Sequence, residues 1–406
     1  MSGSDLNITW VTRSILDYRV PVMQAVDEMC GGNLHVLYGQ AYSPPRVQQK
    51  LQAVLGERAI PLSGEKYLGP RIISNYANAA VRVVYQPGVW RQIRRTRPDV
   101  LIGEGFFQWT SFALAYRILH DVPLVVCYER TFHTERNAQW FRLAYRRLAL
   151  RFIGAMCCNG KLCVDYTRFL GMSPSRITTG HMVADTGSLG TQARSVTESQ
   201  RQQLRHAWDS RGQVFLYVGR LIPLKGLAQF LEGWARLERS LPHAATLVIV
   251  GDGPEEQNLR SQAQQLGLTG VRFVGAVDYD KLAPYYVASD VFVIPTLEDN
   301  WSLVVPEAMA CGLPILCSKY NGCWPELVQA GRNGWVFDPL DAQNILARLR
   351  QCLAAHADLK DMGEQSRQIV AGHTPEVAGK SVMQAVKMAL SGRTARNCDT
   401  LTQCQL

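Results

Sequence analysis

LEDNWSLVVPEAMACGLP, residues 297–314, lies one residue after the apolar run VFVIP of residues 291–295. A short apolar run of this kind predicts a buried strand, and the residues from Leu303 onward predict a helix. Asp299 would then lie in the connecting loop, and Glu307 in the first turns of the helix. Open α/β sheets bind their ligands at the carboxyl ends of their strands. The stretch therefore predicts a strand–loop–helix unit with two acids at the edge where a ligand would bind.

The same alternation of short apolar runs and helix-length amphipathic segments continues along the chain, and it predicts parallel βαβ units. In the first half, the expected strands are Ile8–Thr12, Leu34–Tyr38, Val100–Ile102, Pro123–Tyr128 and Ile153–Cys157. In the second half, they are Val214–Gly219, Thr246–Gly251, Val271–Gly275, Val291–Pro295, Pro314–Cys317 and Trp335–Phe337. The sequence thus predicts two similar α/β units in tandem.

A chain of 406 residues is too long for one ordinary hydrophobic core and suits two domains with a cleft between them. A polar stretch from Asp185 to Ser199 predicts a linker. The expected parts are an N-terminal acceptor-binding domain, a C-terminal nucleotide-sugar domain, a C-terminal helix and a polar tail. Their expected bounds are residues 1–190, 191–372, 373–392 and 393–406.

The net charge of +9 is confined to the first half of the chain. Residues 1–190 contain 22 lysines and arginines against 13 aspartates and glutamates, and the remaining residues balance. Two explanations stay open: plain solubility, or a surface that faces anionic lipid or an acidic substrate. Nucleic acid is not an expected partner, because no helix-turn-helix, zinc-finger or RNP-type motif accompanies the charge.

Two arginine-rich segments, residues 91–97 and 142–151, both predict helices. In and beside the second, aromatic and aliphatic residues alternate with arginines, a pattern that suits a helix in a membrane interface; they are Trp140, Phe141, Leu143, Ala144 and Leu148. The alternative is an ordinary surface helix with one face on the core. No secretory signal and no run of ~18 apolar residues is present. We therefore expect a cytoplasmic protein that is peripheral at the inner face of the plasma membrane, with its 11 cysteines reduced.

Two cations follow the expected strand that ends at Gly219. The chain continues as RLIPLKG, residues 220–226, and a helix is expected from Leu227. The free N–H groups at a helix N-terminus favour anions, and a glycine lets the backbone approach a ligand. Arg220 and Lys225 add two positive charges beside that terminus. The segment therefore predicts a cradle for a diphosphate.

In combination, these segments resemble the family 4 retaining glycosyltransferases, whose fold is GT-B. The resemblance covers about residues 214–340. It implies two Rossmann-like, doubly wound α/β domains that face each other across a cleft, with a C-terminal helix that crosses back to the N-terminal domain. The matching segments are Gly219-Arg220 with Lys225-Gly226, VGDGP at 250–254, VRFVG at 271–275, ASD at 288–290, and the acids Asp299 and Glu307 followed by ACGLP at 310–314.

The resemblance also implies roles for individual residues. Arg220 and Lys225 would bind the donor diphosphate, Glu307 would hold the ribose, and Asp299 would touch the donor sugar. The other residues expected at the donor are Gly219, Glu298, Asn300, Ser302 and Leu303.

The implied reaction is metal-independent hexosyl transfer with retention, because an arginine, a lysine and helix N-termini can neutralise the departing nucleoside diphosphate. The nucleotide sugar is then a substrate, and no cofactor is expected. Asp278-Tyr279-Asp280 does spell the Asp-x-Asp pattern of metal-using transferases. We expect it to cap a helix instead, and we expect no metal site.

The chain departs from the family's pattern at two places. Asp299 stands where the family usually has Glu, so the carboxylate is one methylene shorter, and the neighbouring Glu298 is the alternative acid. The family's glycine-rich turn after the first strand is replaced by TRSILDYRVP, residues 12–21. In that segment, Ser14 and Arg19 are candidates to replace the backbone contact to the donor phosphate, or to contact the acceptor.

Ionisable residues also follow two strands of the first half. Many relatives carry a histidine directly after the strand that ends at Tyr128, and this chain has Glu129 there. The nearest imidazole is His133, four residues later. The candidates for catalysis are Glu129, His133 and Asp299, and those for binding the acceptor are Arg19, Glu104 and Arg130.

The leading hypothesis is transfer of a hexose from a UDP- or GDP-linked donor to a saccharide or a lipid-linked saccharide, in polysaccharide or glycoconjugate biosynthesis. The alternative is a nucleotide-binding interaction protein that keeps the GT-B fold but is impaired in transfer. The missing glycine turn and the shorter acid at Asp299 favour that alternative. A nicotinamide-dependent dehydrogenase is not expected, because the chain lacks a G-x-G-x-x-G turn with a downstream acid.

Overall fold

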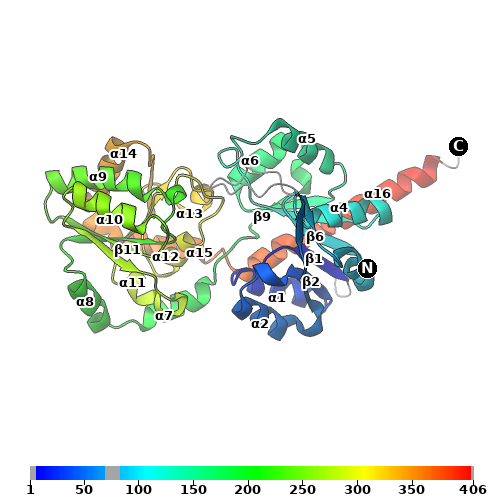
Figure 1. Ribbon diagram of the computed structural model, residues 1–406, viewed down its shortest axis with the longest axis horizontal. Helices are drawn as coiled ribbons and strands as arrows, with labels where there is room; N and C mark the ends of the chain where they lie inside the picture. The colour runs from blue at the N-terminus through cyan, green and yellow to red at the C-terminus, as the bar shows by residue number, and fades with distance from the viewer. Residues whose placement is uncertain (1–5, 69–82, 404–406) are drawn as a thin grey trace. The chain divides into compact units, whose positions relative to one another are not determined.

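The computed structural model describes residues 6–68 and 83–403, with side chains as far as residue 392. The chain divides into two units, one made of residues 1–183 and 375–406 and the other of residues 184–374. Each unit is built around its own parallel sheet with helices on both faces (Figure 1). The fold class is therefore α/β with two doubly wound units, as the sequence predicts.

The first unit contains a seven-stranded parallel sheet in the order β3-β2-β1-β6-β7-β8-β9. Its helices cover both faces, and a short antiparallel ribbon of two further strands accompanies the sheet. The strands of the sheet are β1 (Ile8–Thr12), β2 (Leu34–Gly39), β3 (Ala59–Leu62), β6 (Val100–Glu104), β7 (Leu124–Tyr128), β8 (Ala155–Cys158) and β9 (Ile177–Thr179), and those of the ribbon are β4 (Lys66–Leu68) and β5 (Val83–Tyr85).

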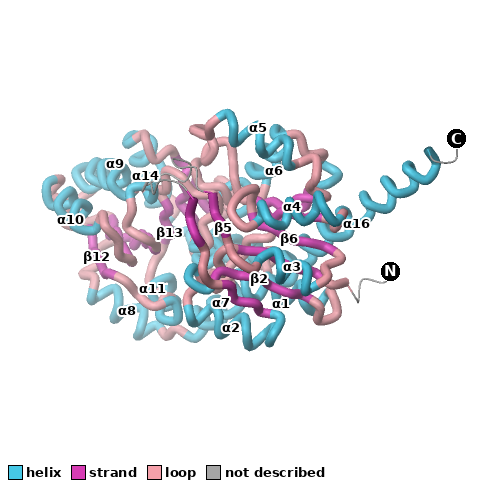
Figure 2. Tube along the Cα trace, turned by 45° about the vertical axis from the view of Figure 1, so that its right-hand side comes forward, coloured by secondary structure: helices cyan, strands magenta, loops and turns pink. Residues whose placement is uncertain are grey.

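Alternate residues of these strands enter two separate cores, one on each face of the sheet. Trp10 of β1 packs in one core and its neighbour Val11 in the other. The first core is covered by α1 (Arg19–Met29), α2 (Pro45–Leu55) and α16 (Pro375–Gln403). The second is covered by α3 (Val89–Thr96), α4 (Thr110–His120), α5 (Trp140–Ala149) and α6 (Lys161–Leu170) (Figure 2).

The C-terminal helix α16 returns to the first unit, as predicted. It packs along α1 and against β8 and β9, and Val382, Val386 and Ala389 lie in the first core. The helix continues to Gln403, beyond the expected start of a polar tail at residue 393, because no proline after Pro375 interrupts it.

The second unit contains a six-stranded parallel sheet in the order β12-β11-β10-β13-β14-β15. Its strands are β10 (Gln213–Val218), β11 (Ala245–Val250), β12 (Val271–Gly275), β13 (Val291–Ile294), β14 (Ile315–Ser318) and β15 (Gly334–Phe337). Its helices are α7 (Thr186–Ser195), α8 (Glu198–Ala207), α9 (Leu227–Ser240), α10 (Glu256–Gln265), α11 (Ala283–Val287), α12 (Val304–Ala310), α13 (Trp324–Leu327), α14 (Ala342–Ala354) and α15 (Leu359–Val370).

The predicted linker at residues 185–199 is wrong, because most of this stretch is helical. The Asp185 carboxylate caps α7 by accepting a hydrogen bond from the Ser188 N–H at 3.2 Å. Thr197 and Gln200 then form a capping box at the start of α8. Glycine disfavours a helix, so Gly190 is one reason why the sequence did not predict α7. In the structure, Gly190 lets α7 approach α12, because a Cβ there would lie 3.5 Å from the Ala310 carbonyl oxygen.

Each sheet reverses its strand order at one point. In the first unit the reversal lies between β1 and β6, and in the second between β10 and β13. Open α/β sheets bind ligands at the carboxyl ends of the strands beside such a switch point. The two switch points are therefore the places to look for functional side chains.

Two further features concern the environment of the chain. Among the described residues, no helix is both long enough and apolar enough to cross a bilayer. The nine cysteines with described side chains are buried, and all nine are free thiols.

Candidate active site

At the switch point of the second unit, glycine allows the loops after β10 and β13 to touch. Gly226, the N-cap residue of α9, has a positive φ of 70°, and a Cβ there would lie 2.0 Å from the Pro295 carbonyl oxygen. The Leu297 N–H donates to the Leu224 carbonyl at 2.8 Å, and the Thr296 hydroxyl donates to the same oxygen at 2.9 Å. The two loops that carry the predicted donor residues are therefore bonded into one structure.

Lys225 and Asp299 meet where these loops join. The Lys225 Nζ lies 2.5 Å from Asp299 Oδ2, and the Ser302 hydroxyl donates to the same oxygen at 2.6 Å. Asp299 Oδ1 accepts from the Trp301 N–H at 3.1 Å. The side chains of Lys225 and Asp299 are 22% and 15% exposed, so the pair is largely shielded yet reachable from solvent.

The loop that carries Asp299 is hydrogen-bonded to the loop that follows β14. The Gly322 N–H donates to the Asp299 carbonyl at 3.0 Å. The Asn321 Oδ1 accepts from the backbone N–H groups of Ser302 at 3.4 Å and Cys323 at 3.3 Å. The sequence analysis did not identify Asn321, whose only signal is its position just beyond a predicted strand. Asn321 fixes the backbone that presents Asp299 and Ser302.

Replacement of Gly322 by alanine is expected to displace this loop. A Cβ at Gly322 would lie 1.8 Å from the Asn300 carbonyl oxygen, so the backbone must move. We expect a loss of about 2 kcal/mol in the free energy of unfolding and weaker donor binding. Urea unfolding measures the first, and Gly187→Ala is a matched control because a Cβ there meets nothing within 4 Å. Equal stability of the two variants would contradict the expectation.

Glu307 is buried in the first turn of α12, with 7% of its surface exposed. The Tyr286 hydroxyl donates to Glu307 Oε2 at 3.1 Å, and this is a buried contact. Burial raises the pKa of Glu307 from 4.5 to about 7, and the Tyr286 hydrogen bond only partly opposes the rise. A further hydrogen-bond donor, such as a ligand hydroxyl, would stabilise the ionised form of this buried carboxylate.

The raised pKa predicts a pH-dependent cost of Glu307 to stability. The unfolded carboxyl ionises near 4.5 and the folded one near 7, so ionisation opposes folding as the pH rises through this window. Glu307→Gln keeps the Tyr286 contact and cannot ionise. We expect the variant to gain about 3 kcal/mol relative to the parent between about pH 4 and pH 8. Urea unfolding at several pH values measures this gain, and parallel profiles would refute it; Glu364→Gln, on an exposed residue, is the control.

The other predicted donor residues lie on the loops that follow β10 and β13. Arg220 is exposed, and within the described part of the chain no carboxylate forms an ion pair with it. Its carbonyl accepts from the buried Tyr217 hydroxyl at 3.0 Å, which anchors the backbone. Leu303 occupies the N-cap position of α12, and Glu298 and Asn300 are half-buried in the loop. Gly219, at the end of β10, completes the set.

Asp278 does not cap a helix in the predicted way. It occupies the N-cap position of the 3₁₀ turn Tyr279–Lys281, but its side chain makes no capping hydrogen bond. Its carboxylate instead lies 3.7 Å from the Lys281 Nζ, because that exposed cation competes for it. Among the described residues, no group of three or more histidine, cysteine or acidic side chains could hold a metal ion.

In the first unit, a buried arginine gathers the predicted acceptor residues. Arg19, at the start of α1, is 3% exposed. Its NH2 donates to Glu129 Oε1 at 2.8 Å, and its Nε lies 3.7 Å from Glu104 Oε1. Glu104 ends β6 and Glu129 follows β7, so adjacent strands bring the two acids together. Their side chains are 23% and 32% exposed, which leaves both carboxylates accessible.

His181 is a member of this cluster that the sequence analysis missed. Its Nδ1 lies 2.9 Å from Arg19 NH1, and its Nε2 lies 3.1 Å from the Tyr128 carbonyl oxygen. Nε2 therefore carries the proton and Nδ1 accepts from Arg19. Burial, together with the charge of Arg19, lowers the pKa of His181 to about 3, so the ring is neutral. His181 could not be predicted because it follows β9, a strand of only three residues that the sequence pattern does not reveal.

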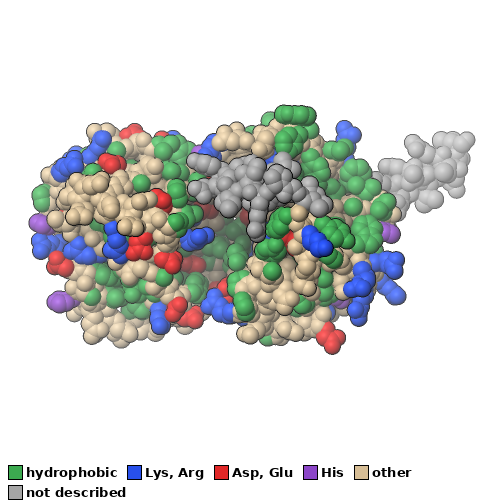
Figure 3. Space-filling view, in the orientation of Figure 1, with side chains coloured by type: hydrophobic (Ala, Val, Ile, Leu, Met, Phe, Trp, Pro, Cys, Tyr) green, Lys and Arg blue, Asp and Glu red, His purple; other side chains and the backbone are tan. Residues whose placement is uncertain are grey.

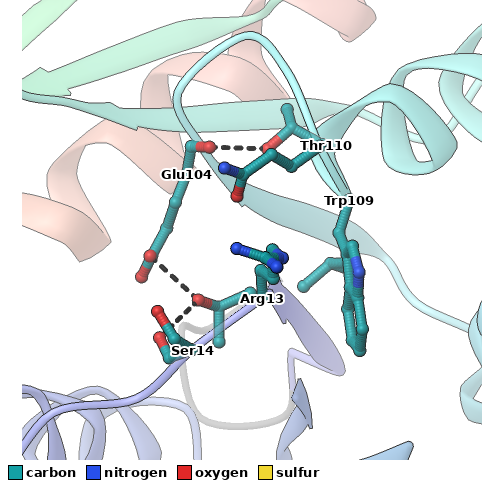
Figure 4. Close-up of a pocket in the computed structure, with 8 residues that line it drawn as sticks. Arg13, Ser14, Glu104, Trp109 and Thr110 are labelled. Atoms are coloured by element: carbon teal, nitrogen blue, oxygen red, sulfur yellow. Dashed lines mark hydrogen bonds between the residues drawn. The ribbon is translucent and has the colours of Figure 1, made fainter. Parts of the chain in front are cut away.

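A pocket of about 40 Å³ lies beside this cluster, at the switch point between β1 and β6 (Figure 4). Glu104 Oε2 accepts from the Thr12 hydroxyl at 2.9 Å, and the Glu104 carbonyl accepts from the Thr110 hydroxyl at 2.8 Å. Arg13 lines the pocket and pairs with Glu65 at 2.9 Å. The pocket can hold a water molecule or a single hydroxyl group. Its remaining lining residues are Val11, Ser14, Gln108 and Trp109.

Arg130 and His133 do not join the Arg19 cluster. Arg130 Nε lies 3.6 Å from Glu135 Oε1, in a second cluster that also contains Arg146. His133 is half-buried in the turn that follows β7, where its carbonyl accepts from Arg136. The predicted residues of the first unit thus separate into Arg19, Glu104 and Glu129 in one group and Arg130 in another.

Comparisons with known proteins agree with this architecture. The family model of glycosyl transferases group 1 matches residues 198–369, and that of the glycosyl transferase 4-like domain matches residues 35–182. A sulfoquinovosyl transferase of Arabidopsis thaliana is 25% identical over 325 residues, which are 75% of this chain and 61% of the relative. D-inositol 3-phosphate glycosyltransferase 2 of Catenulispora acidiphila is 33% identical over 162 residues, which are 38% of each chain. The matched segments thus span 38% to 61% of these relatives' own lengths.

Among solved structures, the chain is similar to HepE of Anabaena. The complex of that protein with UDP has a TM-score of 0.72 at 16% identity, covering 94% of this chain and 100% of HepE. Its complex with UDP-glucose has a TM-score of 0.68 at 17% identity. At this identity the likeness shows the GT-B fold alone. Because the two family models match one unit each, the chain belongs to the group 1 glycosyltransferases with the GT-B fold.

Proposed function

We propose that the chain transfers a hexose from a UDP-linked donor to a hydroxyl group of a saccharide acceptor, with retention and without a metal ion. The observation that carries the proposal is the site between β10 and β13. There, Lys225, Asp299 and Ser302 form one hydrogen-bonded group, with Arg220 and Glu307 on the flanking elements. The UDP and UDP-glucose complexes of HepE support UDP as the nucleotide. GDP is the alternative that the sequence leaves open.

The chemistry requires the site to stabilise a departing nucleoside diphosphate. Arg220 has no carboxylate partner among the described residues, so its five N–H donors are available to phosphate oxygens. Lys225 adds a second cation, and the N-terminus of α9 begins directly after it. These groups supply positive charge where negative charge develops. Retention then follows from attack on the same face of the sugar that the leaving group vacates.

Glu307 and Asp299 have separate roles in this proposal. Glu307, whose pKa burial raises to about 7, accepts hydrogen bonds from the ribose hydroxyls, and these bonds favour its ionised form. Asp299 accepts from a hydroxyl of the donor sugar, and Ser302 and Lys225 hold its carboxylate in place. Its shorter side chain is compensated by this anchoring, so the Glu298 side chain is not needed as a substitute.

The acceptor is assigned to the first unit, with Glu129 and Glu104 as the groups that contact it. Arg19 fixes both carboxylates, and both remain partly exposed. A carboxylate so placed can accept the proton of an attacking hydroxyl. We propose a lipid-linked saccharide at the inner face of a membrane as the acceptor, in glycoconjugate or polysaccharide biosynthesis; the positive excess of residues 1–190 supports it.

A thermal-shift screen with UDP, GDP and ADP tests the donor assignment. We expect UDP to raise the melting temperature most, because a ligand that binds the folded state alone stabilises it. Release of UDP from UDP-glucose, UDP-galactose and related donors then separates a transferase from a protein that only binds. Stabilisation by UDP without release from any donor would favour the impaired interaction protein, and no shift with any nucleotide would overturn the proposal.

A further inference from the structure

The helix α5 exposes large apolar side chains and buries two of its arginines. Arg142 and Arg146 are 8% and 2% exposed, whereas Trp140, Phe141 and Leu148 are 80%, 39% and 55% exposed. The opposite face of the helix lies on the second core, where Ala149 is buried and Leu143 and Tyr145 are partly buried. An ordinary surface helix turns its apolar residues inward and its charges outward. The exposed Trp140, Phe141 and Leu148 depart from this pattern.

The buried arginines are fixed by a network that holds the helix in this orientation. Arg146 NH2 lies 2.6 Å from Glu135 Oε2, and its NH1 donates to the Tyr166 hydroxyl at 3.0 Å. The Arg142 guanidinium lies over the Phe107 ring at 5.6 Å. If the helix rotated, the buried Glu135 would lose its closer cation, Arg146, and keep only Arg130 at 3.6 Å, which is costly. The outer face is thus determined by the fold.

The exposed residues of this segment follow the helical repeat and form one stripe. We call this stripe, together with Phe132 and Phe169, the outer face of α5. Phe132 and Phe169 are 49% and 47% exposed and their rings lie 5.2 Å apart. The Arg147 guanidinium lies 5.2 Å from the Phe169 ring centre, which joins the stripe to α6. The stripe consists of Trp140, Phe141, Ala144, Arg147, Leu148 and Arg151.

The charge around the outer face is almost entirely positive. Residues 130–170 contain eight lysines and arginines and two acids. Of the acids, Glu135 is buried against Arg146, and Asp165 pairs with Lys161 at 3.1 Å. Of the twelve exposed large apolar side chains in the described part of the chain, five lie on the outer face. Figure 3 shows apolar side chains gathered over α5 at the upper edge of the view.

We propose that the outer face of α5 docks on a membrane surface that contains anionic lipid. Aromatic and aliphatic side chains on one stripe enter the boundary between headgroups and acyl chains, and arginines on the same stripe reach the lipid phosphates. A membrane suits this face better than a protein partner, because the positive excess extends beyond the stripe across residues 1–190. The inference rests on the proposed function, because docking would bring the active site to a lipid-linked acceptor in the membrane.

Flotation of the full chain with lipid vesicles tests the docking. One set of vesicles contains phosphatidylcholine alone, and the other also contains phosphatidylglycerol. The apolar variant is Trp140→Ser with Leu148→Ser, and its control is Leu241→Ser with Leu340→Ser, two exposed leucines of the second unit. The charge variant is Arg147→Gln with Arg151→Gln, and its control is Arg94→Gln with Arg95→Gln on α3, which removes the same charge elsewhere. For each variant, the increase in melting temperature on addition of UDP shows, independently of vesicle binding, that the protein is folded and binds the nucleotide.

We expect the parent to float with the anionic vesicles and not with the neutral ones. Both outer-face variants should bind at least tenfold more weakly, and both controls should bind like the parent. The inference is overturned if the parent stays unbound, or if each control weakens binding as much as its test variant. It is also overturned if the parent is a dimer without vesicle binding that the apolar variant converts to a monomer, since the face would then bind a second copy. If UDP does not raise the melting temperature of the parent, the proposed function is contradicted, but the result of the vesicle experiment is unaffected.

Discussion

Replacement of Lys225 by alanine is expected to lower kcat/KM for release of UDP from the sugar donor by about 10²–10³-fold. The lysine is the cation that lies at the junction of the two strand-end loops, 2.5 Å from Asp299. Without it, the departing diphosphate loses a charge partner in a site that is largely shielded from solvent. Because the pair is partly exposed, we expect a change in the free energy of unfolding of no more than about 1 kcal/mol.

Two further variants show whether the effect belongs to the site. Lys281→Ala removes an exposed lysine of the same unit, 75% exposed, and should leave turnover unchanged. Asp299→Asn keeps Lys225 but removes its carboxylate partner, so it should impair sugar binding while UDP binding persists. The assignment of Lys225 to the diphosphate fails if Lys225→Ala retains more than about a tenth of the parental kcat/KM.

Replacement of Arg19 by methionine is expected to cost about 3 kcal/mol of stability and to abolish transfer. The guanidinium is buried, and it contacts Glu129 at 2.8 Å and His181 at 2.9 Å. Methionine fills the space but removes the buried cation that Glu104 and Glu129 share. Urea unfolding measures the loss of stability, and release of UDP in the presence of an acceptor measures the loss of transfer.

A double variant isolates the electrostatic part of this effect. Adding Glu129→Gln to Arg19→Met removes one of the two carboxylates, so about 1 kcal/mol or more of the stability should return. Arg46→Met, at an arginine that is 58% exposed and pairs with Asp17, should cost almost nothing. A destabilisation by Arg19→Met equal to that of Arg46→Met would mean that the buried cluster does not depend on its cation.

The sequence predicts the strands of both sheets well, where they are long and apolar. All eleven expected strands occur within two residues of their predicted ends. The misses are short or poorly patterned: β9 has three residues, and β3 carries Pro61, which suits its place at the edge of the sheet. Because β9 was missed, His181 was missed with it, although it follows the strand in the same way as Glu129 follows β7.

The polar contacts within the site were less predictable. Glu104 and Glu129 could be predicted as site residues because each lies at the carboxyl end of a predicted strand. The two strands are neighbours in the parallel sheet, which brings the two acids together. The meeting of Lys225 with Asp299 depends on the backbone bonds between the loops of Leu224 and Leu297, which no spacing in the sequence encodes.

The burial of Arg146 shows the same limit for a helix. The sequence pattern alone would turn its arginines outward, but Glu135 from the preceding loop supplies a buried counter-ion. That partner could not be identified without the fold, because a single acid in a loop carries no signal of burial.

Calorimetric titration of UDP and GDP into the parent, Lys225→Ala and Glu307→Gln tests the central assignment most directly. We predict one UDP site per chain, with binding at least tenfold weaker in both variants, because one loses the diphosphate cation and the other the ribose carboxylate. UDP affinity of the parent should also rise as the pH increases through about 7, where Glu307 ionises. Equal UDP affinity in all three proteins, or no binding of either nucleotide by the parent, would contradict a nucleotide-sugar site between β10 and β13.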